Sequence, residues 1–507
     1  MVSRRAILKT SALAGLGGLL PMWKAAAMSV STPLVITTTG ILTTQAPYAH
    51  TSIHLYYIWS LVYGSLMRYN YQTKQYEGVL AKKWEIINPT TWRFYLRDDL
   101  KRHDGGPGPT AGDVVHSWKR IMSDTDSQQR FYMSEIDLFK EVDSQTFDVV
   151  TKRPFAQLLS FLADRMVVTS AELYRDFQRA ADTKAPFGWG PYKLSRFDVD
   201  QQLVLQRNDA WKDGKEQRPE TVVYRLMAEP EQRVSALATN EVQIARQVPP
   251  QLVPRVKRLD NVRAMESGST EYMFLGMNCT AAPFDDVRVR QAVACSVNRQ
   301  LIIDKLLFKL ADPMIGALGR YHLAYPPEKD IPQYDPKRAR ALLAEAGYPD
   351  GVSIDFYTAN GRYIADRQVA EAVTQMLKLG GFTVKLHTPD YATFVNMVRE
   401  GKCPLYYTGR GATANSMEAL SQFFETGVSK RINYSNAKVD ELFASLRAAF
   451  EEPEQIELVR QISDILATDV PAVFMWTHRF VHGVRQDVQW TPDATGEVWL
   501  PDVSLSR

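Results

Sequence analysis

Hydrophobic and polar residues follow regular periods in the first half of the chain. Residues 34–40 (LVITTTG) are typical of a buried strand, and residues 53–70 are apolar and aromatic at helical spacing, which predicts an amphipathic helix. Thr110 followed by Asp113 is the signature of a helix start, and residues 190–208 predict a pair of hairpin strands. The first half therefore mixes strands and helices.

The second half shows the same mixture with sharper boundaries. Residues 285–307 carry apolar side chains at helical spacing and predict one helix. Asp335 is placed to cap the start of another helix, and Gly347 is placed to end it. Residues 352–388 have the pattern strand, helix, strand, which demands parallel pairing within a buried sheet. The predicted fold class is α/β.

The first residues have the three parts of an export signal. Arg4 and Arg5 open it, an apolar stretch follows, and small residues at 25–27 suit a signal peptidase. The apolar stretch is shorter than the roughly 20 residues that a membrane-spanning helix needs. Residues 3–9 resemble the twin-arginine signal of bacteria, with an ordinary secretory signal as the alternative. We expect residues 1–27 to be removed and the mature protein to be periplasmic.

Charge and composition narrow the classes of protein. Residues 1–27 hold four basic residues and no acid, so their removal takes the formal net charge from +3 to about −1. No long basic run is present, and nucleic-acid binding is not expected. With 45% hydrophobic residues in 507, the chain can fill more than one core, so two or more lobes are expected. Cys279, Cys295 and Cys403 are too few for a disulfide framework, although one bridge stays open.

No pattern of catalytic or metal-binding residues stands out. The sequence contains no G-x-S-x-G elbow, no phosphate-binding loop of the G-x-x-x-x-G-K-[ST] type and no H-E-x-x-H motif. His50 and His54 could share a helix face, but a zinc site needs further nitrogen or sulfur ligands and none stands nearby. The sequence therefore predicts a binding protein with no cofactor and no metal. An exported hydrolase and a chemoreceptor-only sensor are the alternatives.

Several stretches together carry a resemblance to a known family. They are residues 80–121 (with HDG and TAGDVVHSW), 188–194 (GWGPYKL), 205–211 (LQRNDAW), 236–245, 283–303 (PFDDVRVRQAV and onward) and YDPKRARALLAEAGYPDG near residue 340. These stretches stand in the family's order from about residue 30 to residue 500. On this basis the chain resembles the extracellular solute-binding proteins of family 5.

The resemblance implies a Venus-flytrap fold, the type II fold of periplasmic binding proteins. In this fold two α/β lobes are joined by two hinge strands, and lobe I carries an extra subdomain. By analogy, lobe I spans residues 28–266 and 478–507, lobe II spans residues 267–477, and the hinge strands lie near residues 272–278 and 472–478. The resemblance also implies that a monomer captures a small-molecule or peptide solute by lobe closure. It would deliver this solute to an ABC permease and ATPase complex at the inner membrane.

The site for the solute departs from the pattern of peptide receptors. Those receptors have a Trp-x-x-Asp-like element whose aspartate pairs with the α-ammonium group of the peptide. In the matching stretch, residues 406–424, Arg410 stands at the position of the aromatic residue and Thr413 at that of the aspartate. A guanidinium group beside a hydroxyl favours a carboxylate, phosphate or sulfonate over an ammonium group. Arg367 falls near the place where dipeptide receptors hold the peptide carboxylate, and is a second anion-binding candidate.

Aromatic residues complete the predicted site. Trp189 stands where the family usually has a small residue between two glycines, so it would narrow the cleft or stack on a planar solute. Tyr57 and Trp59 are similar candidates, with core packing as the alternative. The predicted solute is a small organic compound that is anionic or bears an amide. A di- or oligopeptide receptor proper is the rival hypothesis.

Overall fold

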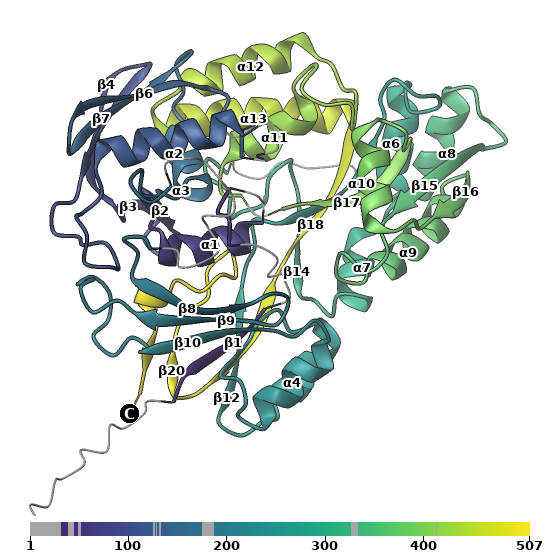
Figure 1. Cartoon of the computed structure of the whole chain (residues 1–507). Coiled ribbons are helices and arrows are strands. Elements are labelled where there is room, and N and C mark those ends of the chain that lie inside the picture. The colour runs from purple at the N-terminus through teal and green to yellow at the C-terminus, as the bar shows by residue number, and fades with distance from the viewer. Residues whose placement is uncertain are drawn as a thin grey trace, which may run out of the picture. The chain divides into compact units, whose positions relative to one another are not determined.

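Two large β-sheets organise the described part of the chain (Figure 1). The computed structural model describes residues 32–38, 45–48, 52–124, 127, 129–130, 133–174, 187–325, 333–411 and 413–506. The predicted export signal, residues 1–27, lies outside the described residues. Within these ranges, no helix combines the length and the apolar character needed to cross a membrane.

The first sheet has seven strands and joins residues from both ends of the chain. In spatial order they are β12 (Val262–Ser267), β19 (Phe480–Arg485), β11 (Ile244–Ala245), β1 (Leu34–Thr38), β10 (Thr221–Leu226), β9 (Gln202–Arg207) and β8 (Tyr192–Asp198). β1 is parallel to both of its neighbours, whereas β8, β9 and β10 pair antiparallel. The hairpin predicted over residues 190–208 is therefore confirmed.

The second sheet has six strands. In spatial order they are β14 (Ala311–Pro313), β18 (Ala472–His478), β13 (Tyr272–Met277), β17 (Leu405–Arg410), β15 (Val352–Thr358) and β16 (Phe382–His387). β15 and β16 are parallel and are joined by helix α9 (Asp366–Leu379). The strand–helix–strand prediction and the α/β class are confirmed.

Two short segments connect the seven-stranded sheet to the six-stranded sheet. Residues 268–271 lead from β12 to β13, and Arg479 alone separates β18 from β19. The strands predicted as hinges, β13 and β18, are neighbours inside the six-stranded sheet. The lobe boundaries inferred from the family resemblance stay a prediction.

A four-stranded antiparallel sheet and three helices form a further part of the N-terminal half. Its strands are β4 (Ala81–Asn88), β5 (Thr91–Leu96), β7 (Thr146–Thr151) and β6 (Ile136–Asp143), and the nearby elements are α1 (Ile53–Val62), α2 (Ala111–Ser123), α3 (Leu158–Arg165) and the hairpin β2–β3 (Met67–Asn70 and Gln75–Gly78). Helix α2 packs on β6, and α3 packs on α1 and β2.

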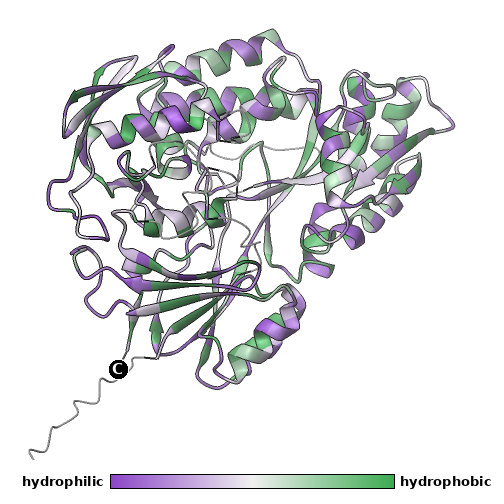
Figure 2. Cartoon of the chain, viewed as in Figure 1, coloured by the Kyte–Doolittle hydropathy of each residue, from purple (hydrophilic) through white to green (hydrophobic). Residues whose placement is uncertain are grey.

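Both faces of the six-stranded sheet are buried. Tyr272 and Phe274 of β13 face a core shared with α11 (Ser416–Phe424) and α12 (Ala437–Ala448), whereas Met273 and Leu275 face the core under α9. Successive residues of a strand point to opposite faces of the sheet. Because a core covers each face here, every residue of β13 is buried. In Figure 2, helices that carry both hydrophobic and hydrophilic residues surround strands with many hydrophobic residues.

Two helix predictions were wrong in length. The helix predicted over residues 53–70 ends at Val62, because Gly64 adopts a φ of 90° that terminates α1, and β2 follows. The helix predicted over residues 285–307 is two helices, α6 (Val287–Ser296) and α7 (Arg299–Lys305). The second begins anew because the Asn298 side chain accepts a hydrogen bond from the Leu301 amide.

The predicted helix starts are confirmed. Thr110 and Asp113 form a reciprocal capping box at α2, and the Asp335 carboxylate accepts hydrogen bonds from two amides of α8. The remaining elements are α4 (Pro230–Ala238), α5 (Val253–Val256), α8 (Pro336–Glu345), α10 (Tyr391–Arg399), α13 (Glu452–Asp469), the strand pair β20–β21 (Val488–Gln489 and Ser504–Leu505) and the 3₁₀ turns η2 (Pro250–Leu252) and η3 (Leu500–Asp502).

Candidate functional site

Trp189 is buried in a turn that is pressed against the end of α1. Its side chain is 1% exposed, and its indole N–H donates a hydrogen bond to the carbonyl of Pro107 at 2.9 Å. The next residue has no room for a side chain, because a Cβ at Gly190 would lie 2.2 Å from the carbonyl oxygen of Leu61. Backbone packing therefore fixes this turn, and a hydrogen bond orients the indole.

His103 holds the same turn from the other side. Its Nδ1 accepts a hydrogen bond from the Gly188 amide at 3.3 Å, and its Nε2–H donates to the Gly190 carbonyl at 2.9 Å. One nitrogen accepts and the other donates, so the imidazole is neutral. Burial lowers the pKa of His103 to about 4, in agreement with this assignment. Sequence reasoning did not select His103, although it is the histidine of the HDG stretch that carries the family resemblance.

A pocket of about 360 Å³ opens beside Trp189. Its other lining residues are Arg102, Pro107, Gly108, Thr110, Asp113, Ser170, Ala171 and Glu172.

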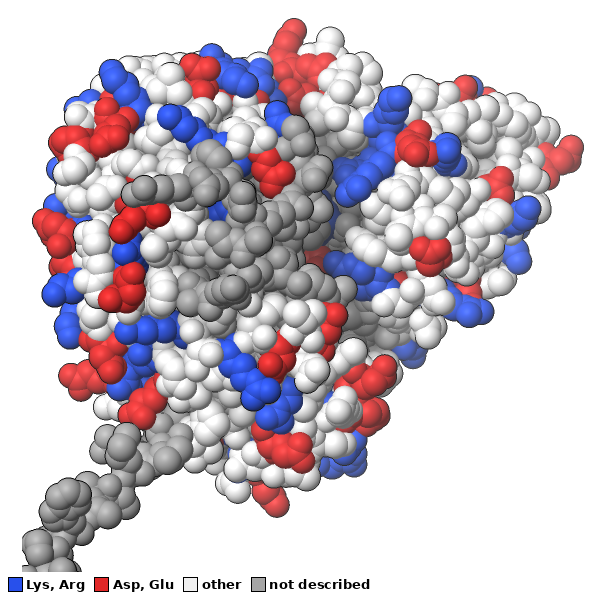
Figure 3. Space-filling view, in the orientation of Figure 1, with Lys and Arg blue, Asp and Glu red and all other residues white. Residues whose placement is uncertain are grey.

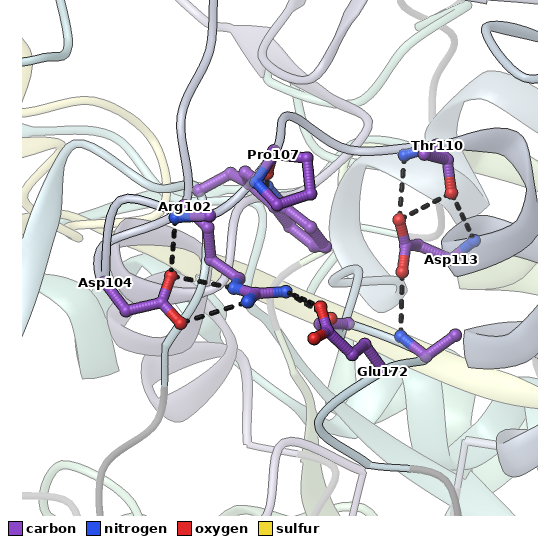
Figure 4. A network of polar contacts seen from close by, with 10 residues as sticks. Arg102, Asp104, Pro107, Thr110, Asp113 and Glu172 are labelled. Carbon is purple, nitrogen blue, oxygen red and sulfur yellow. Dashed lines mark hydrogen bonds and ion pairs between the residues drawn. The ribbon is translucent and has the colours of Figure 1, made fainter.

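The charged groups of this pocket are engaged with one another. Arg102 donates two hydrogen bonds to Asp104, at 2.9 and 3.0 Å, and one to Glu172 at 2.8 Å (Figure 4). The Arg102 hydrogen bonds hold the pKa of Asp104 below its usual value. The Asp113 carboxylate accepts from the Thr110 amide and hydroxyl. Two carboxylates thus bind the Arg102 guanidinium group, and a third, that of Asp113, lines the same pocket, which makes the pocket a poor site for an anion.

Arg410 and Thr413 meet at a second place, together with two residues that sequence reasoning missed. An Nη atom of Arg410 lies 2.8 Å from the Glu418 carboxylate, and an Nη atom of Arg165 lies 3.1 Å from the same oxygen. The Thr413 hydroxyl donates to the other carboxylate oxygen at 3.0 Å. We call Arg165, Arg410, Thr413 and Glu418 the Arg410 cluster. Its ionic side chains are buried, with 5%, 11% and 5% exposure for Arg165, Arg410 and Glu418.

The Arg410 cluster keeps its glutamate ionised. Burial opposes ionisation of Glu418, but Arg165, Arg410 and the Thr413 hydroxyl outweigh it and hold the pKa of Glu418 below its ordinary value. The Nε of Arg410 is buried and has no hydrogen-bond acceptor among the described residues. One carboxylate therefore serves two guanidinium groups, and Arg410 still has a donor to satisfy.

Arg367 lies on the surface in the first turn of α9. Its side chain is 59% exposed and pairs with Glu371 at 3.0 Å.

Another arginine, Arg362, stands in the loop before α9, with its guanidinium 5.1 Å from the ring centre of Tyr363. Burial raises the pKa of Glu271, and the positive charge of Arg362 acts against this shift. The cation in the loop between β15 and α9 that acts on the segment joining the two sheets is therefore Arg362, a residue that sequence reasoning did not choose.

Tyr57 and Trp59 belong to the core around α1. Trp59 is completely buried and packs against Tyr63 and Phe197, each at a ring-centre distance of 6.1 Å. Tyr57 is 9% exposed in the same core. The structure thus brings Arg410 and Thr413 together, and it places Trp189, Tyr57, Trp59 and Arg367 elsewhere.

The described residues contain no group of three or more His, Cys, Asp or Glu residues that could hold a metal ion. His50 lies outside the described residues, and His54 is engaged with Thr38 at 2.6 Å and Glu497 at 2.7 Å. The three cysteines are free thiols. On the face shown in Figure 3, basic and acidic residues are interspersed and form no continuous basic stripe.

Comparison with known proteins places these features in a family. The family model for bacterial extracellular solute-binding proteins, family 5, matches residues 75–430. The dipeptide-binding protein of Escherichia coli (strain K12) is 26% identical over 481 residues, which cover 88% of this chain and 89% of that protein. The glutathione-binding protein GsiB of Pectobacterium atrosepticum is 26% identical over 446 residues, or 85% and 84% of the two chains.

A structural comparison supports the same conclusion for the fold. The crystal structure of NikA from Brucella suis in complex with Fe(III)-EDTA matches with a TM-score of 0.83 at 17% identity, over 94% of this chain and 100% of that chain. The two-lobed fold of periplasmic binding proteins is therefore confirmed. The chain belongs to the bacterial extracellular solute-binding proteins of family 5 and is a substrate-binding component of an ABC importer.

Proposed function

We propose that the solute of this receptor is a small organic anion and that its anionic group is held at the Arg410 cluster. The observation that carries this proposal is the shared carboxylate: Glu418 accepts from both Arg165 and Arg410, while the buried Nε of Arg410 lacks an acceptor among the described residues. A buried donor or charge without a partner is costly, and a carboxylate or phosphate oxygen offers guanidinium its preferred acceptor.

The rival hypothesis, a receptor for ordinary peptides, requires an acceptor for an α-ammonium group. Glu418 is the carboxylate of the Arg410 cluster, but it already accepts hydrogen bonds from two guanidinium groups and the Thr413 hydroxyl. An ammonium group would therefore meet two cations before it met a free carboxylate oxygen. Dipeptides and glutathione still belong among the compounds to be tested, because relatives of this chain are named for binding them.

The proposal predicts that Arg410→Gln weakens binding of an anionic solute by about tenfold to a hundredfold, the equivalent of one charge-assisted hydrogen bond of about 1.5–3 kcal/mol. Isothermal titration calorimetry would compare succinate, glutathione and a dipeptide amide, which carries an α-ammonium group and no carboxylate. The variant retains the ion pair between Arg165 and Glu418, so the fold is expected to survive.

Arg367→Gln is the matched control, because it removes one arginine from an exposed pair in the same half of the protein. Its affinity should equal that of the wild type. The proposal is wrong if Arg410→Gln folds and binds the anion as tightly as the wild type, or if the tightest compound is a cation.

We also propose that the protein reaches the periplasm by the twin-arginine route, acts as a monomer and releases its solute chemically unaltered to the permease. The support for the route is the pair Arg4 and Arg5 ahead of a weakly apolar stretch. Replacing both arginines by lysine should leave uncleaved precursor in the cytoplasm, as seen by cell fractionation. Normal export of that variant would favour an ordinary secretory signal.

A further inference from the structure

The Arg410 cluster joins two parts of the protein that have separate cores. Arg165 ends α3, whose residues Leu158 and Leu162 pack in the core around α1. Glu418 lies in α11, whose apolar residues pack in the core of the six-stranded sheet. The two residues are 253 positions apart in the sequence, and their side chains meet at 3.1 Å.

Further hydrogen bonds run between the same two parts. The Ala156 amide donates to the Arg447 carbonyl at 2.8 Å, and the Gln157 side chain donates to the Leu446 carbonyl at 2.7 Å. Both acceptors lie in the last turn of α12, where carbonyls have no partner within the helix. These donors therefore bond to carbonyls at the end of a helix, although the Leu446 carbonyl also accepts from the Ala449 amide at 3.4 Å.

Only two connections, residues 268–271 and Arg479, join the seven-stranded sheet to the six-stranded sheet. Hinge motion between two packed units is absorbed by such connecting residues, while each unit moves as a body. Opening of the cleft would separate α3 from α11 and break the contacts of Arg165, but it would leave Arg410, Thr413 and Glu418 together, since all three stand within nine residues of one another.

We infer that Arg165 is a positioning residue that reaches the Arg410 cluster only in the closed protein, where it shares Glu418 with Arg410 and favours a solute anion as the acceptor for the unpartnered Nε of Arg410. In the open protein Arg410 is the one guanidinium group of the Arg410 cluster that stays with Glu418, and the Thr413 hydroxyl stays with it too. On closure, Arg165 competes for the same carboxylate oxygen, and Arg410 gains by binding an acceptor from the solute. Closure and anion binding thereby favour each other. This inference rests on the proposed function for the identity of the solute. The role of Arg165 in closure can be tested without any solute.

The test uses Arg165→Gln, with Glu418→Gln as a second variant that has nearly the same shape. Hydrogen exchange of the ligand-free protein reports closure, because the Ala156 amide is protected by a carbonyl of α12. Calorimetry with glutathione and succinate reports binding. The control is Arg153→Gln, which removes an exposed arginine, paired with Glu135, from the same part of the chain.

We expect the Ala156 amide to exchange at least fivefold faster in Arg165→Gln and Glu418→Gln, and probe affinity in Arg165→Gln to fall at least fivefold. Arg153→Gln should match the wild type in both measurements. Wild-type exchange at Ala156 together with wild-type affinity in Arg165→Gln would overturn the inference. Failure of the proposed function looks different, because no anion would then bind the wild type, whereas the exchange rates would still respond to Arg165.

Discussion

Glu418 shows how a single side chain keeps a charge in the interior. Burial alone acts to raise its pKa, and the two guanidinium groups with the Thr413 hydroxyl bring the pKa below the ordinary value. Removing one partner from such a group leaves a buried charge poorly compensated, which costs several kcal/mol. Exposed pairs such as Arg367 with Glu371 contribute about 0–1 kcal/mol, since water and salt screen them.

At the same scale, we expect one added methyl group at Gly190 to destabilise the protein by a steric clash. Gly190→Ala would place a carbon 2.2 Å from the Leu61 carbonyl oxygen, so the turn that carries Trp189 must shift. We expect the free energy of unfolding in urea to fall by about 1–3 kcal/mol. The control is Gly316→Ala, because no atom lies within 4 Å of the added carbon there. Equal losses in the two variants would show that the Gly190 contact does not matter.

At the scale of elements, the sequence predicted helices and strands correctly where the residues that begin and end each element are all present in the local sequence. The cap at Asp335 and the strand–helix–strand unit over residues 352–388 could be predicted because each depends on neighbouring residues only. Apolar periodicity failed where it continued across a break. It does not distinguish a helix that stops at Val62 from one that runs on to Asn70, or one helix from two joined at Asn298.

The candidate site was partly predictable for the same reason. Arg410 and Thr413 stand in one short stretch that the family resemblance marks, and the structure places them together. Arg165 could not be predicted, because its partner lies 253 residues away and no local pattern encodes such a contact. Trp189 was chosen from its position between two glycines. That position fixes its backbone against α1 but does not tell where the indole points.

At the scale of the whole molecule, four buried histidines couple folding to pH. Burial lowers the pKa of His103, His322 and His478 to about 4 and that of His482 to about 3. In the unfolded chain each pKa is near 6.5. As pH falls from about 6.5 toward 4, the unfolded chain binds protons that the folded protein does not, so stability is lost over this range.

We expect each of these histidines to lower the free energy of unfolding by about 2 kcal/mol as the pH falls from 7 to 5. The slope of unfolding free energy against pH, from urea titrations at several pH values, measures this loss. His482→Phe should reduce this slope, because it removes a titrating ring whose two nitrogens have no hydrogen-bond partner among the described residues. Stability at pH 7 should change little, since the ring already packs against Trp490 at 5.2 Å. An unchanged slope would mean that His482 is protonated, or stabilised, in the folded state.

The interior position of β19 has a consequence for biosynthesis. β19 lies between β12 and β11, yet it is made from residues 480–485 of a 507-residue chain. Until the ribosome has translated that segment, β11 and β12 each present an unpaired strand edge, which is a template for aggregation. A nascent or prematurely terminated polypeptide therefore cannot complete the sheet that starts at Leu34, and any export machinery that accepts only folded cargo would pass full-length molecules alone.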